Sequence, residues 1–269
     1  MRKTALILAT LLAPLAVAQP AMALTQEDLL QAQLLPGWQL EDGHHMAGLS
    51  LALAPGWKTY WRSPGEAGIP PQFDWSGSQN VKAVHVHWPS PVVFHTNGMQ
   101  TVGYDGAVVL PLEVVPEVPG QPVVLRAHVD MGICKDICLP AEVLVSAELI
   151  APGLDQGGIR AALKARPKTA AQAGVGRVSC VVEPIADGLR VTASVEIAAQ
   201  SGQEAVVVEP SDRAIWVGEA VTTRNEGMLI SVADMVAPSG TPFALDRSGL
   251  RLTVLGGQRA VQIDGCPAP

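Results

Sequence analysis

The sequence is poor in charge, and most of its charge is negative. Charged residues make up 16% of the 269 residues, with 18 Lys and Arg against 25 Asp and Glu, and the formal net charge is −7. A partner such as nucleic acid or an anionic membrane surface needs a basic face that neutralises its phosphates. The composition therefore argues against both kinds of partner.

Long apolar runs are also missing, apart from a short one at the start. Residues 5–18 form an apolar run, broken only by Thr10 and Pro14, that follows Arg2 and Lys3, and a small-residue A-x-A cleavage site comes shortly afterwards. A membrane helix needs about 20 apolar residues, so a membrane anchor is the weaker alternative. We expect residues 1–23 to be a signal peptide cleaved after Ala23, and the mature protein to lie in the periplasm without a membrane span.

Two common catalytic signatures are absent as well. No Gly-rich phosphate loop leads from a predicted strand into a helix, and no G-x-S-x-G serine elbow occurs. The acidic residues show no readable pairing. The chemistry that remains is that of the cysteines, which needs no organic cofactor because sulfur itself carries the electrons.

Many short strands are predicted instead of long helices. The chain holds 26 Gly and 22 Pro, and apolar and polar residues alternate along several Val- and Leu-rich stretches, as in half-buried strands. The clearest stretches in the first half are residues 46–54, 80–88, 106–115, 123–130 and 141–149. Helices are predicted only at residues 26–33 and 154–165.

A composition shift divides the chain. Ala-Pro-Gly at 151–153 opens a stretch rich in Ala, Lys and Gly, after which β-rich runs resume near residue 178. Such runs, separated by turns, are typical of immunoglobulin-like sandwiches. We predict an all-β chain with two immunoglobulin-like β-sandwich domains, residues 24–150 and 176–269, joined by a linker of residues 151–175 that contains a short helix.

All four cysteines lie after the predicted cleavage site, and four cysteines allow three pairings. The spacing favours Cys134 with Cys138 and Cys180 with Cys266. The chain-entropy model assigns the long bridge about 4.6 kcal/mol and the short one about 2 kcal/mol. We therefore expect Cys180–Cys266 to be a structural disulfide and the short pair to suit redox exchange.

The spacing alone leaves three readings of the short pair open. Exchange needs a reachable thiolate and a second thiol that resolves the mixed disulfide. Lys135 favours a thiolate and Asp136 opposes it, so the local charge does not decide. A structural clip of the loop and metal ligation are the alternatives.

Five motifs occur in an order that resembles a known family. They are Gly56-Trp-Lys-Thr-Tyr60-Trp-Arg-Ser-Pro64-Gly, Gly68-Ile-Pro-Pro71, Trp88-Pro89, Val102-Gly-Tyr104-Asp-Gly and Gly132-Ile-Cys134-Lys-Asp-Ile-Cys138-Leu-Pro-Ala-Glu142. Together they resemble the amino-terminal periplasmic domain of the DsbD family of disulfide reductases, with a cysteine spacing similar to that of the ScsB branch. The resemblance covers residues 40–150.

The resemblance implies an electron relay. A separate membrane-embedded DsbD/CcdA-like or thioredoxin-like donor would reduce the cysteine pair, which would then reduce disulfide-containing periplasmic clients. Carried over, Cys138 forms the mixed disulfides and Cys134 resolves them. Tyr60, and Phe94 in the stretch that corresponds to the family's cap loop, are expected to shape the site.

The histidines suggest one further alternative. All six lie in the first predicted domain, and His85 and His87 fall on one face of a predicted strand, a geometry that a metal can use. A copper-binding or copper-tolerance protein is thus an alternative to the redox function. Solvated surface histidines explain the pattern more simply, so we predict no metal ligands.

Overall fold

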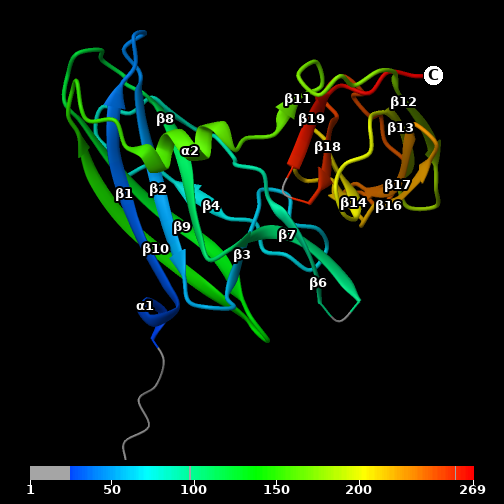
Figure 1. Cartoon of the computed structure of the whole chain (residues 1–269), viewed down its shortest axis with the longest axis horizontal. Helices are drawn as coiled ribbons and strands as arrows, with labels where there is room; N and C mark the ends of the chain where they lie inside the picture. The colour runs from blue at the N-terminus through cyan, green and yellow to red at the C-terminus, as the bar shows by residue number, and fades with distance from the viewer. Residues whose placement is uncertain (1–24, 97, 258) are drawn as a thin grey trace, which may run out of the picture.

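The computed structural model describes residues 25–269 apart from residues 97 and 258. The predicted signal peptide lies outside the described residues. Two β-sheet units lie side by side, with the first half of the chain in one and the second half in the other (Figure 1). The predicted all-β class is confirmed, because two short helices are the only helices among the described residues.

Two sheets build the first unit. One has the order β1 (Leu30–Gln39), β2 (His45–Leu53), β8 (Ala107–Val115), β5 (Ala83–Val86). The other has the order β10 (Cys138–Leu149), β9 (Val123–Cys134), β3 (Lys58–Tyr60), β7 (Met99–Asp105), β6 (Val92–Thr96), with β4 (Gln72–Asp74) also paired to β9.

Two further sheets build the second unit. One has the order β11 (Lys168–Thr169), β19 (Arg259–Asp264), β18 (Arg251–Gly256), β14 (Glu204–Glu209). The other has the order β12 (Val178–Pro184), β13 (Leu189–Glu196), β17 (Met228–Val236), β15 (Trp216–Val217), with β16 (Val221–Asn225) also paired to β17. Strands β18 and β19 pair antiparallel as a hairpin at the end of the chain.

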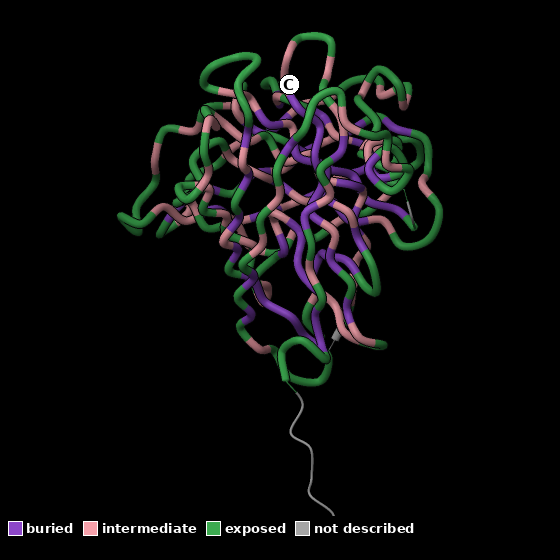
Figure 2. The backbone as a smooth tube through the Cα atoms, turned by 90° about the vertical axis from the view of Figure 1, so that its left-hand side faces the viewer, coloured by how far each residue is buried: buried purple, intermediate pink, exposed green. Residues whose placement is uncertain are grey.

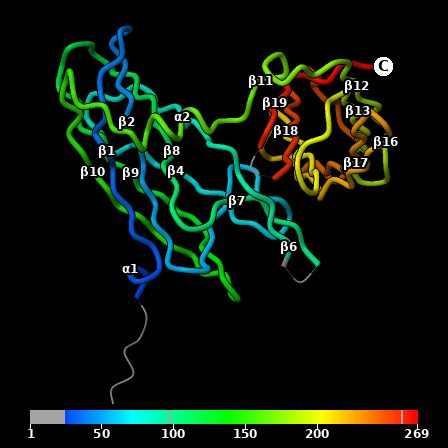
Figure 3. Tube along the Cα trace, viewed as in Figure 1, coloured from blue at the N-terminus to red at the C-terminus, as the bar shows by residue number. Residues whose placement is uncertain are grey.

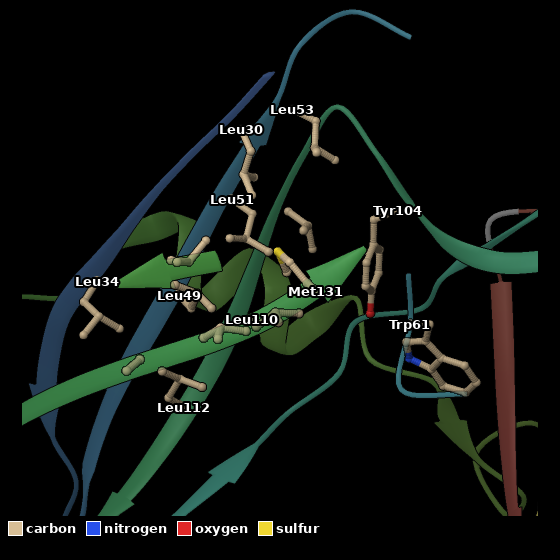
Figure 4. Packing of buried hydrophobic residues seen from close by; sticks show 14 of the residues in the cluster. Leu30, Leu34, Leu49, Leu51, Leu53, Trp61, Tyr104, Leu110, Leu112 and Met131 are labelled. Atoms are coloured by element: carbon tan, nitrogen blue, oxygen red, sulfur yellow. The ribbon is translucent and has the colours of Figure 1, made fainter. Parts of the chain in front are cut away.

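The alternating pattern of β9 shows why these segments form strands. Every second residue from Val123 to Met131 is buried, whereas Arg126 and Asp130 on the other face are exposed. Successive side chains of a strand point to opposite faces, so this pattern buries one face of the sheet. The buried leucines of β1, β2 and β8 cover that face and form the core with Met131 and Trp61 (Figure 4). Buried backbone accordingly runs through the interior while exposed segments gather at the loops (Figure 2).

The predicted helix at residues 26–33 is too long. Helix α1 (Gln26–Leu29) has a single turn, and the chain continues directly as β1. Leu30 and Leu34 are buried on β1, where they pair with Leu53 and Leu49 of β2. Tertiary pairing and burial of this strand therefore outweigh the local helical pattern.

The segment predicted as a linker contacts both units. Helix α2 (Gly157–Lys164) buries Ile159 against the first unit, where a Cβ added to Gly48 would come within 2.9 Å of the Ile159 side chain. Glycine thus lets this helix approach β2 closely. Strand β11 then pairs in parallel with β19 of the second unit. No helix within the described residues has the length and apolar character that a membrane crossing requires.

Candidate functional site

The short cysteine pair closes the β9–β10 hairpin. Cys134 ends β9, Cys138 begins β10, and the two face each other in the strand register with a Cα–Cα distance of 4.1 Å. A disulfide joins them across a turn of three residues, in which the Lys135 N–H donates to the Ile137 carbonyl at 3.1 Å. The sulfurs therefore sit at the tip of a long hairpin.

The two sulfur-bearing residues differ sharply in exposure. Cys134 is 1% exposed, whereas Cys138 is an exposed residue next to the turn, in which Ile137 is 63% exposed. Cys134 shares its face of β9 with Gly132, opposite the core-facing Ile133. Its burial therefore comes from groups outside the core, and only the Cys138 side of the bond faces solvent.

Tyr60 is the group that touches both sulfurs. Its hydroxyl lies 2.7 Å from Sγ of Cys134 and 3.2 Å from Sγ of Cys138, and it donates a longer hydrogen bond of 3.4 Å to the Ala67 carbonyl. Burial raises the pKa of Tyr60 above the ordinary value for tyrosine. The hydroxyl therefore keeps its single proton at neutral pH and can turn it from the Ala67 carbonyl toward sulfur.

Two glycines allow the ring of Tyr60 to lie close against the hairpin. A Cβ added to Gly132 would come within 2.9 Å of Cε2 of Tyr60, and one added to Gly68 within 3.0 Å of Cδ1. Strand β3 is held to β9 by the Thr59 hydroxyl, which donates to the Gly132 carbonyl at 2.8 Å. The ring therefore lies close against these two glycines, and this position sets the direction in which its hydroxyl points.

Lys58 is a site residue that the sequence reasoning missed. It pairs with Cys134 across β3 and β9, which places its side chain on the cysteine side of the sheet. Partial burial lowers the pKa of Lys58 from its ordinary value, since a desolvated ammonium is disfavoured. Its position two residues before Tyr60 was the available signal, because residues i and i+2 share a face of a strand.

Phe94 lies farther from the sulfurs than Tyr60. It belongs to β6, and the strands β3 and β7 separate β6 from β9. The Nζ of Lys58 lies 4.8 Å from the centre of the Phe94 ring, a cation–π distance. The contact with Lys58 therefore connects Phe94 to the cysteine side of the sheet. The role of Phe94 in shaping the site stays a prediction.

The second disulfide joins Cys180 to Cys266 with a Cα–Cα distance of 5.5 Å. Both residues belong to the core of the second unit, where Cys180 is 0% and Cys266 1% exposed. The Cys180 N–H also donates to the Pro267 carbonyl at 2.7 Å. These contacts fasten the last residues of the chain to β12, and an incoming thiolate cannot reach either sulfur.

Two of the six histidines, His44 and His87, contact one carboxylate. The two oxygens of Glu113 lie 2.8 Å from Nδ1 of His44 and 3.0 Å from Nε2 of His87, whereas His85 is exposed. The hydrogen bond to His44 is the main cause that lowers the pKa of Glu113. Ligand atoms of Asp42, His44 and Glu113 lie within 4.8 Å of one another. Hydrogen bonds account for this cluster, and it contains neither cysteine of the hairpin.

Comparisons with known proteins find a family that matches the first unit and a solved structure that is similar to the whole fold. Residues 28–149 match the family described as "Thiol:disulfide interchange protein DsbD, N-terminal". The crystal structure of the N-terminal periplasmic domain of ScsB from Proteus mirabilis is similar, with 25% sequence identity and a TM-score of 0.67. The match covers 92% of this chain and 96% of that one. No curated protein matches the chain.

The two disulfides should differ in their effect on stability. Replacing Cys180 and Cys266 together by Ala should lower the free energy of unfolding by about 4 to 5 kcal/mol, because an 86-residue separation leaves a large loop unrestrained in the unfolded chain. The matched control replaces Cys134 and Cys138 by Ala and should cost about 2 kcal/mol. Urea denaturation measures both. Equal losses would contradict the division between staple and reactive pair.

Loss of the Tyr60 hydroxyl should weaken the thiolate form of the reduced pair. A hydrogen bond to a charged group contributes about 1.5–3 kcal/mol, so Tyr60→Phe should raise the thiol pKa by about 1 unit or more. The rate of iodoacetamide alkylation as a function of pH measures this pKa. Tyr104→Phe is the matched control, because the Tyr104 hydroxyl donates to the Pro89 carbonyl and contacts no sulfur. If the pH dependence of the alkylation rate is unchanged in Tyr60→Phe, the Tyr60 hydroxyl does not stabilise the thiolate.

Proposed function

We propose, from the premise that residues 28–149 match the family of DsbD amino-terminal domains, that this chain is a periplasmic thiol–disulfide interchange protein. The observation that carries the proposal is the asymmetry of the hairpin. Cys138 is an exposed residue, while Cys134 is buried beside it under a tyrosine hydroxyl. That arrangement gives one sulfur for attack and one for resolution, as exchange requires.

Reduction of the pair begins with a thiolate of the electron donor. It attacks Sγ of Cys138, a mixed disulfide forms, and the bond to Cys134 breaks. Cys134 leaves as a thiolate, to which the Tyr60 hydroxyl can donate from its position 2.7 Å away. A second donor thiol then attacks the mixed disulfide and releases Cys138. Two electrons and two protons have passed to the pair, and the donor is left as a disulfide.

Reduction of a client reverses these roles. The Cys138 thiolate attacks the client disulfide, forms a mixed disulfide and releases one client thiol. Cys134 then attacks Sγ of Cys138, the original bond forms again, and the second client thiol leaves. The client gains the two electrons that the pair gives up. Because Cys134 is buried beside Cys138, resolution is intramolecular and needs no further reagent.

The surroundings of the pair fit a protein partner. Ile137 in the turn is 63% exposed, and Ile69, which lies against Gly132, is 45% exposed. Apolar side chains exposed beside a reactive sulfur are suited to transient docking of another protein. We propose that the donor is a thioredoxin-like or membrane-embedded DsbD/CcdA-like protein, and that the clients are periplasmic proteins with disulfides.

The two cysteines should give opposite results in a trapping experiment. Cys134→Ser keeps the exposed thiol but removes the resolving one, so it should accumulate mixed disulfides with an oxidised thioredoxin-like protein or with glutathione disulfide. Cys138→Ser should form roughly tenfold less, because its remaining thiol is buried. Intact mass and non-reducing gels measure the adducts. Equal trapping by both variants would refute the assignment of roles.

The reduction potential separates exchange from a structural clip. A pair that exchanges with protein partners should equilibrate with glutathione buffers and have a potential above about −300 mV. The Cys180–Cys266 bond serves as the internal control and should stay oxidised in the same buffers. Alkylation of the freed thiols, followed by peptide mass analysis, reports each bond separately. A value for Cys134–Cys138 well below about −300 mV would favour the clip.

A further inference from the structure

The chain that follows Tyr60 leaves the first unit, contacts the second and returns. We call residues 61–69 the Tyr60 loop. Its first residue, Trp61, is fully buried, and the core cluster around it includes Leu255 and Ala260 of the second unit. Figure 3 shows this part of the chain, in cyan near β3 and β7, beside the red strands β18 and β19. Figure 4 shows the Trp61 ring close to one of these red strands.

The first contact of the Tyr60 loop is a two-pronged ion pair. Nε and Nη2 of Arg62 lie 2.8 and 2.9 Å from the two carboxylate oxygens of Glu209, at the end of β14. The side chains are only 10% and 14% exposed. Paired hydrogen bonds between a guanidinium and a carboxylate fix orientation as well as distance. This contact therefore sets the position of the Arg62 backbone relative to the second unit.

The partners of this ion pair are themselves held in place. Nη2 of Arg62 donates to Oε1 of Gln262 on β19 at 3.3 Å, and the hydroxyl of Thr253 on β18 donates to Glu209 at 3.4 Å. The guanidinium also lies 4.1 Å from the Trp61 ring. Three strands of the second unit thus contribute to holding Arg62 in place.

A second contact lies farther along the Tyr60 loop. Oε1 of Glu66 accepts a hydrogen bond of 3.0 Å from the Glu219 N–H, and the Glu219 carboxylate accepts one of 3.3 Å from the Gln100 N–H on β7. A Cβ added to Gly218 would come within 3.3 Å of Glu66 Oε1. The segment after β15 therefore holds both the Tyr60 loop and the neighbouring strand.

The end of the Tyr60 loop returns to the redox site. The Ala67 carbonyl accepts the Tyr60 hydroxyl, Gly68 packs on the Tyr60 ring, and Ile69 lies against Gly132. The residues that fix the ring thus follow directly on those that the second unit holds. Because Glu66 and Ala67 are adjacent in the chain, any shift of Glu66 also moves the carbonyl that the hydroxyl contacts.

We propose that the second unit is a positioning element for the redox site: through Arg62–Glu209 and Glu66–Glu219 it holds the Tyr60 loop, and so the Tyr60 hydroxyl, against the sulfurs. The proposal rests on the proposed function and adds a role for residues 176–269. Arg62 and Glu209 act through Tyr60 and do not touch sulfur. Loosening them should therefore weaken thiolate stabilisation while leaving both cysteines in place.

The test compares two similarly buried ion pairs, one that joins the Tyr60 loop to the second unit and one that lies wholly within the second unit. Glu209→Gln weakens the pair with Arg62, whereas Glu204→Gln weakens the pair of Glu204 with Arg224, whose side chains are 12% and 21% exposed and whose hydrogen bonds stay within the second unit. Iodoacetamide alkylation of the reduced full-length chain is measured as a function of pH. Glu209→Gln should slow alkylation at pH 7 about three- to tenfold by raising the thiol pKa, and Glu204→Gln should not.

A double-mutant cycle asks whether the effect passes through Tyr60. If it does, adding Glu209→Gln to Tyr60→Phe should not raise the thiol pKa any further, since the hydroxyl is already gone. Additive effects, or a shift in Tyr60→Phe with none in Glu209→Gln, would overturn the proposal. Thermal unfolding checks that each variant folds, and Glu66→Ala replaces Glu209→Gln if that variant does not. Because alkylation needs no partner protein, this outcome is independent of mixed-disulfide trapping, which tests the proposed function.

Discussion

The register between β9 and β10 is the constraint on which the redox site depends. The two strands pair continuously from Cys134 opposite Cys138 to Leu149 opposite Val123. Alternate residues of β9 are buried in the core, so a slip by one residue would turn every core side chain toward solvent. The core thus fixes the register over the whole hairpin. The register in turn brings two cysteines into direct opposition on the side of the sheet away from the core.

From that opposition follows the difference between the two sulfurs. Cys134 lies within the sheet, between Cys138 on one side and Lys58 on the other, and the Tyr60 ring covers it. Cys138 lies on β10, the outer strand of the sheet, next to an exposed turn. A disulfide between an inner and an outer strand, with Tyr60 against the inner cysteine, therefore has one accessible and one shielded cysteine.

The second unit also contributes to the position of the redox site, through its contacts with the Tyr60 loop. Its own core is closed by Cys180–Cys266, which ties the chain end to β12, and this gives β14, β18 and β19 a firm frame. Strands β14 and β19 present Glu209 and Gln262 to Arg62, and Thr253 on β18 donates to Glu209. The structural disulfide and the hairpin disulfide are in this way connected, because the strands of the first hold the Tyr60 loop, and that loop packs on the Tyr60 ring whose hydroxyl contacts the second.

The sequence by itself determined what depends on local pattern. Period-two alternation indicated the strands and the all-β class, cysteine spacing indicated which thiols pair, and the ordered motifs placed Tyr60 near the cysteines. Tertiary structure alone decided the rest. Pairing with β2 turned most of the predicted helix at 26–33 into a strand, strand register put Lys58 opposite Cys134, and Arg62 met Glu209 across 147 residues. Such contacts depend on how strands and sheets pair and pack. For Lys58 the spacing along the chain indicated only that it shares a strand face with Tyr60, and not which residue of β9 it would oppose.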